Sequence, residues 1–309
     1  MKLAFVFPGQ GSQSVGMLKG YDGLPELTAI REEVVEVLGQ DFLKIMDEGP
    51  AEQLSLTVNT QPAMVSGGYV AYRAWRALGG PAPQVVAGHS LGEYTALVAA
   101  GALTFRDCLP LVRFRAQSMQ EAVPEGKGAM AAIINLDDDK VREACAAAGG
   151  EVQAVNFNSP GQVVIAGEKA AVERAMEKCK ALGAKRALPL PVSAPFHSTL
   201  MKPAGMKLKG YLEKTSLSKP ALELINNVDV AVESDAARIK DALVRQAYSP
   251  VRWVETVKKM AAGGVTHIVE CGPGKVLAGL TRRIDPGVQS FALADRASLE
   301  QALAALKGA

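Results

Sequence analysis

The sequence has few of the residues that would assign it quickly to a class. Among 309 residues it has four cysteines and three histidines, and no two cysteines have the C-x-x-C spacing of a metal site. A chain of this length needs no disulfides to fold, so free thiols in a reducing compartment are expected. The formal net charge of +2 argues against a general nucleic-acid-binding protein, which needs a concentrated basic face.

Long apolar runs are also absent. No stretch approaches the roughly 18 consecutive apolar residues of a membrane-spanning helix, and the run LAFVF (3–7) is too short for a secretory signal. We therefore expect a cytoplasmic protein without a membrane partner. The composition, with 48% hydrophobic and 21% charged residues, is typical of a soluble globular protein, and the length suggests about two domains.

Short apolar runs alternate with helical patterns in the first and last parts of the chain. Residues 3–7 and 85–88 are predicted to be buried parallel strands, and residues 25–38 and 61–78 are predicted helices. A further helix is predicted over 104–122. The alternation indicates an α/β fold with a mostly parallel sheet that helices cover on both faces.

The pattern changes between residues 127 and 192, where the predicted elements follow the ferredoxin-like order β-α-β-β-α-β. The α/β pattern then resumes, with a helix over 199–214 and two helices between 234 and 262. The sequence therefore predicts a catalytic core formed by 1–126 and 193–309, with a ferredoxin-like subdomain, 127–192, inserted into it.

A serine lies on a sharp turn after the second predicted strand. In VVAGHSLGEYTALVAAG (85–101), Gly88, Ser90 and Gly92 match G-x-S-x-G, a strand-to-helix turn that exposes a nucleophilic hydroxyl. The pattern alone is weak, and a structural turn that happens to carry serine is the alternative. The strand before it and the helix after it are the context that the motif requires, so we interpret Ser90 as a nucleophile.

A serine nucleophile needs a base, and three histidines are available. The side chain of His89 is expected to point away from its neighbour Ser90, and His267 lies in a predicted strand, where a structural role is favoured. His197 lies in the irregular segment PVSAPFHSTLMKPAG (191–205), and functional groups concentrate on such loops. We expect His197 to be the base, with a structural loop histidine as the alternative.

The orienting acid of a triad is missing from its usual place. Hydrolases with this turn run Ser, Asp/Glu, His along the chain, but most acids between Ser90 and His197 lie on the predicted subdomain or on exposed helices. A backbone carbonyl that accepts the Nδ1 proton can orient an imidazole as well. A Ser–His dyad is therefore chemically sufficient.

Two backbone N–H groups are candidates for an oxyanion hole. One belongs to Leu91, at the start of the predicted helix, and the other to Gln10 in the loop GQGSQ (9–13), which also follows a strand end. The alternative for this loop is a dinucleotide-binding fingerprint. It is disfavoured because Ser14 stands where the third glycine belongs.

An arginine lies on the apolar face of the helix LPLVRFRAQSMQEAV (109–123). Arg115 shares its face with Leu111, Val112 and Met119, and an unpaired buried guanidinium is costly. A structural salt bridge and the bidentate binding of a substrate carboxylate both satisfy this requirement. The residues alone leave both interpretations open.

Seven motifs, in order along nearly the whole chain, together resemble the malonyl-CoA:acyl carrier protein transacylase family. They are FPGQGSQ (7–13), GHSLGEYTALVAAG (88–101), RFRAQSMQEAV (113–123), NFNSPGQVVIAG (156–167), FHSTLMKPA (196–204), QAYSPVRW (246–253) and ECGPGKVL (270–277). The resemblance implies an α/β-hydrolase-like core that carries a ferredoxin-like subdomain.

The resemblance also implies roles for the site residues. Ser90 would be the acylated nucleophile, His197 the general base and then acid, and Gln246 the residue whose main-chain carbonyl orients His197. Gln10 and Leu91 would supply the oxyanion hole.

Three further residues would bind the substrate. Arg115 would pair with the free carboxylate of a malonyl group, and Asn158 would lie near the site. Phe196 would crowd a branched acyl group, which favours malonyl over methylmalonyl.

The function implied is ping-pong transfer of malonyl from malonyl-CoA to the phosphopantetheine thiol of holo acyl carrier protein, for fatty acid biosynthesis. The alternatives are an acyltransferase for a polyketide synthase, a serine esterase or thioesterase, and a non-enzymatic binding protein. We expect a monomer with no metal or organic cofactor. Malonyl-CoA would be a substrate and not a cofactor. The candidates for a basic rim that binds the acidic carrier, each equally explained as a solvated helix face, are Lys202, Lys207, Lys258, Lys259, Arg282 and Arg283.

Overall fold

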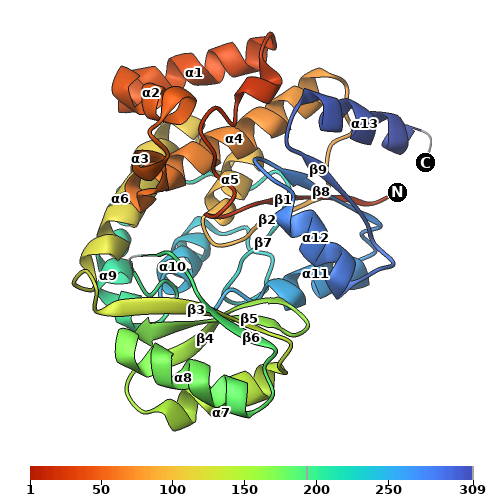
Figure 1. The fold of residues 1–309 in the computed structure, drawn as a ribbon. Coiled ribbons are helices and arrows are strands. Elements are labelled where there is room, and N and C mark those ends of the chain that lie inside the picture. The colour runs from red at the N-terminus through yellow and green to blue at the C-terminus, as the bar shows by residue number, and fades with distance from the viewer. Residues whose placement is uncertain (193, 308–309) are drawn as a thin grey trace.

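The computed structural model describes residues 1–192 and 194–307, and two separate sheets organise them (Figure 1). The larger sheet has five parallel strands in the order β7-β2-β1-β8-β9. Its strands are β1 (Leu3–Phe7), β2 (Val85–Gly88), β7 (Glu223–Ile225), β8 (His267–Cys271) and β9 (Gln289–Leu293).

Strand β1 lies in the middle of this sheet and is buried on both faces. Phe5 and Phe7 pack into one apolar cluster, whereas Ala4 and Val6 pack into another, as the two-residue repeat of a strand requires. The sequence LAFVF therefore has no polar position, as expected of a parallel strand covered on both sides.

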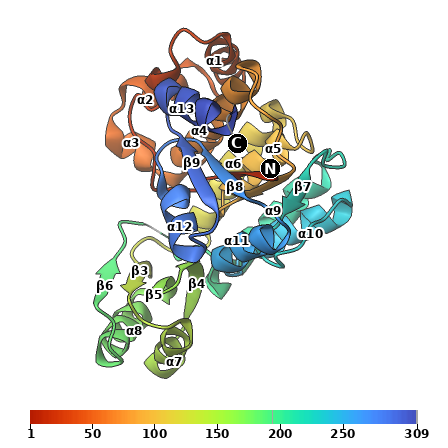
Figure 2. The ribbon, with the colours of Figure 1, turned by 90° about the vertical axis from the view of Figure 1, so that its right-hand side faces the viewer.

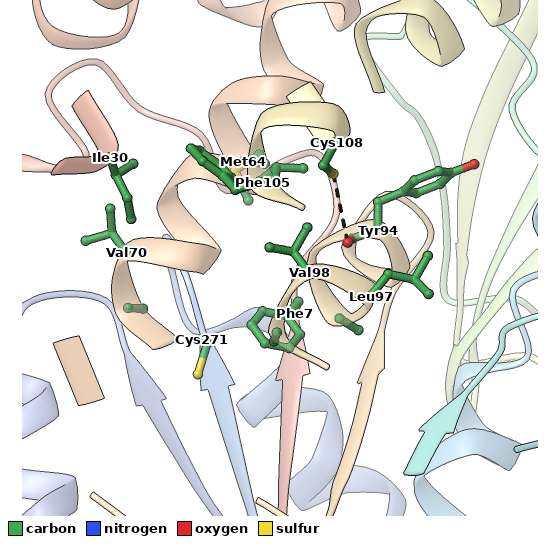
Figure 3. Close-up of a cluster of buried hydrophobic side chains, with 14 of the residues drawn as sticks. Phe7, Ile30, Met64, Val70, Tyr94, Leu97, Val98, Phe105, Cys108 and Cys271 are labelled. Atoms are coloured by element: carbon green, nitrogen blue, oxygen red, sulfur yellow. Dashed lines mark hydrogen bonds between the residues drawn. The ribbon is translucent and has the colours of Figure 1, made fainter. Parts of the chain in front are cut away.

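Helices supply the rest of both clusters. Figure 3 shows part of the first cluster, in which Phe7 of β1 lies beside Leu97 and Val98 of α5. The helices that contribute to this cluster include α1 (Pro25–Leu38), α2 (Gln40–Glu48), α3 (Ala51–Ser55), α4 (Thr57–Ala77), α5 (Gly92–Ala99), α6 (Phe105–Glu121), α9 (Lys202–Glu213), α10 (Ala236–Gln246) and α13 (Arg296–Lys307). The opposite face is covered by α11 (Trp253–Ala262) and α12 (Val276–Ile284).

The smaller sheet is antiparallel, with the order β4-β5-β3-β6. Helices α7 and α8 cover the face that points away from the parallel sheet (Figures 1 and 2). The elements are β3 (Gly128–Ile134), α7 (Asp138–Ala148), β4 (Val152–Ser159), β5 (Gln162–Glu168), α8 (Lys169–Ala181) and β6 (Arg186–Pro189). The predicted α/β class, with a parallel sheet and a separate ferredoxin-like unit, is confirmed. The predicted domain boundary between residues 192 and 193 falls on residue 193, which lies outside the described ranges. Residues 308–309, which the prediction assigns to the core, also lie outside them.

The smaller sheet is joined to the core along the edge of β4. The Val251 N–H donates to the Val155 carbonyl at 2.8 Å, and the Phe157 N–H donates to the Val251 carbonyl at 3.0 Å. These bonds extend β4 with the segment that follows α10. The small sheet is therefore attached to the core next to Gln246, the last residue of that helix.

Some helix ends differ from the prediction. The sequence predicts a helix over 61–78, but α4 begins four residues earlier, at Thr57, and contains Pro62. The helix predicted over 199–214 is a 3₁₀ turn at Thr199–Met201 followed by α9, because Pro203 begins the regular helix. Among the described helices, none is both long and apolar enough to cross a bilayer.

Candidate active site

The loops that carry Gln10 and Ser90 lie side by side. Strands β1 and β2 are neighbours, Phe7 is in register with Gly88, and the His89 N–H donates to the Phe7 carbonyl at 2.9 Å. Both loops therefore lie at the carboxyl ends of the parallel strands. Open α/β sheets bind ligands at this end, as the sequence predicts.

The two glycines of the G-x-S-x-G motif are required by close backbone packing. A Cβ on Gly88 would lie 1.8 Å from the carbonyl carbon of Gly92, and a Cβ on Gly92 would lie 2.0 Å from the Phe7 carbonyl oxygen. Both neighbours are backbone atoms that cannot turn aside. Glycine at both positions therefore allows helix α5 to begin in contact with the ends of β1 and β2, directly after the turn at Ser90.

We expect Gly92→Ala to destabilise the protein by about 3 kcal/mol, because the methyl group forces α5 away from β1. The measurement is the free energy of unfolding in denaturant. Gly210→Ala is the matched control, because Gly210 lies within α9 with open space around its Cα. It should stabilise the protein by roughly 0.5–1 kcal/mol. Wild-type stability in Gly92→Ala would contradict the packing argument.

Ser90 has a left-handed backbone, with φ of 51°. This conformation costs a non-glycine residue on the order of 1–3 kcal/mol and needs support from its surroundings. Asn227, just beyond the end of β7, provides that support: its Oδ1 accepts the Ser90 N–H at 2.7 Å and its Nδ2 donates to the Gly88 carbonyl at 2.6 Å. The serine is therefore held from both sides of the turn.

His197 contacts the serine directly. Its Nε2 lies 2.6 Å from Ser90 Oγ, and its Nδ1 lies 2.8 Å from the main-chain carbonyl oxygen of Gln246. Because a carbonyl only accepts, Nδ1 carries the proton and Nε2 is free to accept one from the serine. The geometry is that of a nucleophile and a base oriented by a third group.

The imidazole of His197 is held in its neutral form. The side chain is 3% exposed, and burial together with the charge of Arg115 lowers the pKa of His197 to about 3. The other two histidines are placed elsewhere. His89 Nε2 lies 2.8 Å from Asn158 Oδ1, and His267 Nδ1 lies 2.8 Å from the Thr266 hydroxyl.

Arg115 lies beside the same serine and is 2% exposed. Its Nη2 donates to Ser90 Oγ at 3.2 Å and to Gln246 Oε1 at 2.9 Å, and its Nη1 donates to Gln61 Oε1 at 2.9 Å. The guanidinium also lies over the Tyr94 ring, 5.3 Å from its centre. Within residues 1–192 and 194–307, no carboxylate comes within 4.0 Å of Arg115, so the salt-bridge alternative does not apply there. Burial lowers the pKa of Arg115.

The two predicted oxyanion donors lie on the neighbouring loops, Leu91 directly after Ser90 and Gln10 after β1. Neither the Gln10 N–H nor the Leu91 N–H donates a hydrogen bond to any other described residue, and Leu91 is the N-cap of α5. The Gln10 side chain is fixed, since its Oε1 accepts from Thr57 Oγ1 at 2.6 Å and from Gln61 Nε2 at 3.1 Å. Two backbone N–H groups are thus available for a bound oxygen.

Asn158 and Phe196 lie around this centre without a direct contact to Ser90. Asn158 reaches the site through its hydrogen bond with His89. Phe196 is buried in the cluster between the small sheet and the core, next in sequence to His197.

Three residues of the site are not predicted from the sequence: Gln61, Glu93 and Asn227. All three are buried and hydrogen-bonded to predicted site residues. The local signals are unequal. Glu93 is a charged side chain in the otherwise mostly apolar helix α5, Gln61 precedes Pro62 in α4, and Asn227 follows the carboxyl end of the strand next to β2.

The comparisons with known proteins agree with this geometry. A family model described as the acyl transferase domain matches residues 4–298. The chain belongs to the acyl transferase family. It is therefore an acyltransferase, and the sequence resemblance to malonyl-CoA:acyl carrier protein transacylases is confirmed by individual relatives.

Those relatives cover nearly the whole chain. The malonyl CoA-acyl carrier protein transacylase of Salmonella typhimurium is 54% identical over 305 residues, which are 98% of this chain and 99% of that relative. The protein of the same name from Bacillus subtilis is 45% identical over 99% of this chain and 98% of its own length.

Two solved structures superpose on the fold. One is an acyl-carrier-protein S-malonyltransferase from Burkholderia pseudomallei, with a TM-score of 0.97, 61% identity and coverage of 98% of this chain and 100% of that chain. The other is a malonyl-transacylase in complex with its type II PKS acyl-carrier protein, with a TM-score of 0.97, 50% identity and coverage of 99% and 100%.

Proposed function

We propose that this acyltransferase moves a malonyl group from malonyl-CoA to the phosphopantetheine thiol of holo acyl carrier protein through a malonyl ester of Ser90. The observation that carries the proposal is the buried Arg115 guanidinium, 3.2 Å from Ser90 Oγ and without a carboxylate partner among the described residues. A thioester whose acyl group ends in a carboxylate would supply that partner. The names of the relatives support this choice of substrate.

The first half-reaction acylates the serine. His197 Nε2 takes the Ser90 Oγ proton as Oγ attacks the thioester carbon, and the oxyanion is stabilised by the N–H groups of Gln10 and Leu91. When the tetrahedral intermediate collapses, the carbon–sulfur bond breaks and His197 returns the proton to the sulfur of CoA. The Gln246 carbonyl holds the imidazole throughout.

The second half-reaction runs in reverse with a new thiol. His197 takes the proton of the phosphopantetheine thiol, the sulfur attacks the malonyl ester, and Ser90 regains its proton as the ester bond breaks. Arg115 holds the far carboxylate in both halves, so the ester carbonyl stays in the oxyanion hole. Phe196 and Asn158 would shape the acyl pocket from the subdomain side.

We further propose a cytoplasmic monomer that supplies fatty acid biosynthesis and needs no metal or organic cofactor. The carrier protein would dock on a basic rim, for which the candidates are Lys202, Lys207, Lys258, Lys259, Arg282 and Arg283. A second candidate function is service to a polyketide carrier protein, since one structural relative was solved with a type II PKS carrier.

Intact-mass measurement after brief mixing with malonyl-CoA tests the proposal. We expect wild type to gain one malonyl group and Ser90→Ala to gain none, because Ser90 Oγ is the hydroxyl that His197 Nε2 contacts. Adding holo acyl carrier protein should move the malonyl group to the carrier. Competition between a fatty-acid and a polyketide carrier ranks the two candidate functions.

Two outcomes would contradict the proposal. Loss of the adduct at the same rate without a carrier protein would identify a thioesterase. An adduct that forms equally well in Ser90→Ala would exclude Ser90 as the nucleophile.

A further inference from the structure

Glu93 is a buried carboxylate next to the active site that the proposed chemistry does not use. It lies in α5 one helical turn after Ser90 and is 1% exposed. Buried carboxylates need hydrogen-bond partners, and Glu93 Oε2 has two: the Asn227 N–H at 3.0 Å and Gln246 Nε2 at 2.9 Å. Both partners also form hydrogen bonds with the backbone of Ser90.

The contacts of Glu93 determine which way the Gln246 carboxamide faces. Gln246 Nε2 donates to Glu93 Oε2 and to the Ser90 carbonyl oxygen, both at 2.9 Å. Its Oε1 accepts from Arg115 Nη2 at 2.9 Å. An ionised carboxylate only accepts hydrogen bonds, so it requires the amide nitrogen on its own side and leaves the amide oxygen for Arg115.

The amide oxygen in turn directs the guanidinium. The Arg115 Nη2 that donates to Gln246 Oε1 also donates to Ser90 Oγ, at 3.2 Å. If the carboxamide were turned over, its NH₂ group would face Nη2, and two donors would oppose each other. Arg115 would then lose one of the two side-chain oxygens, those of Gln61 and Gln246, that hold it beside the serine.

We propose that Glu93 is a positioning residue for acyl-group selectivity: it fixes the Gln246 carboxamide, whose oxygen aims Arg115 at the free carboxylate of the acyl group. This inference rests on the proposed role of Arg115. It assigns to Glu93 a larger effect on carboxylate-bearing acyl groups than on acylation itself, because the Gln246 main-chain carbonyl orients His197 and a glutamine at position 93 keeps an oxygen for the Asn227 N–H.

Glu93→Gln is the direct test, because a neutral amide of the same shape can donate as well as accept and so lets Gln246 turn over. Acylation of Ser90 by malonyl-CoA and by acetyl-CoA is followed by intact mass, and the ratio of the two kcat/KM values is compared. We expect this ratio to fall about tenfold, since one charge-assisted hydrogen bond is lost. The acetyl value should stay within about threefold of wild type. Burial raises the pKa of Glu93 to about 7, so the assays are run near pH 8.5, where the carboxylate is ionised.

A double-mutant cycle shows whether Glu93 acts through Gln246. Gln246→Met removes the carboxamide but keeps the main-chain carbonyl that holds His197. We expect it to lower the ratio, and Glu93→Gln to lower it no further in the Gln246→Met protein. If Glu93→Gln does not fold, Glu93→Asp, whose carboxylate is set back by one methylene, should lower the ratio in its place.

Glu270→Gln is the matched control, since Glu270 is also buried and also accepts a backbone N–H, that of Ala278, at 2.8 Å. Its malonyl-to-acetyl ratio should equal that of wild type. An unchanged ratio in Glu93→Gln, an equal fall of both rates, or full additivity in the cycle would each overturn the inference. Arg115→Ala separates the two proposals. If Arg115→Ala keeps the malonyl-to-acetyl ratio, the proposed role of Arg115 itself is wrong. If the ratio falls in Arg115→Ala but not in Glu93→Gln, only the role of Glu93 is refuted.

Discussion

Arg115→Ala is expected to lower kcat/KM for malonyl-CoA by about 100-fold, because two charge-assisted hydrogen bonds to the substrate carboxylate are lost. Acetyl-CoA has no such carboxylate, so its use should fall little or rise. The Ser90–His197 contact at 2.6 Å and the main-chain carbonyl of Gln246 that orients His197 both remain when the guanidinium is removed. The change is therefore one of selectivity rather than of the acylation chemistry.

The measurement is the initial rate of transfer to acyl carrier protein from each thioester. Arg113→Ala is the matched control: Arg113 lies on the same helix but faces the other way, with its guanidinium 5.6 Å from the centre of the Phe42 ring. It should keep the wild-type preference. If malonyl and acetyl transfer fell equally in Arg115→Ala, the carboxylate-binding role would be refuted.

His197→Ala is expected to slow acylation of Ser90 by about 1000-fold, because the hydroxyl loses its general base. The fold should persist. Alanine can adopt the left-handed backbone of this position, with φ of 64°, at some cost in stability. Circular dichroism of the variant checks this. Single-turnover formation of the malonyl adduct checks the rate.

The pH dependence distinguishes this base from an ordinary histidine. With the pKa of His197 lowered to about 3 by burial, the imidazole is already neutral at pH 5, and wild-type acylation should be flat between pH 5 and 6. That window lies below the pKa of about 7 of Glu93, so Glu93 does not titrate appreciably within it. An ordinary histidine with a pKa near 6.5 would instead give a rise of several-fold over the same interval. Such a rise would contradict the assignment.

The sequence predicts the reacting groups because each carries a local signal. Ser90 lies in a strand–turn–helix motif, His197 lies in a proline-bearing loop, and Arg115 interrupts an apolar helical face. The α/β class follows in the same way from the length and periodicity of short segments. These are properties of neighbouring residues, which a sequence displays directly.

The network behind these groups is not predicted because it depends on tertiary packing. Glu93 meets Asn227 and Gln246 across 134 and 153 residues of chain, and only the order of the strands brings them together. The left-handed backbone of His197 and the hydrogen bonds between β4 and Val251 also depend on contacts with residues that are distant in the sequence. Only a buried polar residue in an apolar helix, such as Glu93, gives a hint of this network.

The bonds between β4 and Val251 bear on how this enzyme can be recombined with its relatives. A chimaera that exchanged the four-stranded unit as a cassette would replace the strand on which the segment after Gln246 is aligned, and with it the setting of the carbonyl that holds His197. The two crossover points at the ends of the insert are therefore insufficient. Ala247 also packs in one apolar cluster with Val155 and Val164 of the small sheet, so residues 246–251 are best taken from the same parent as β4.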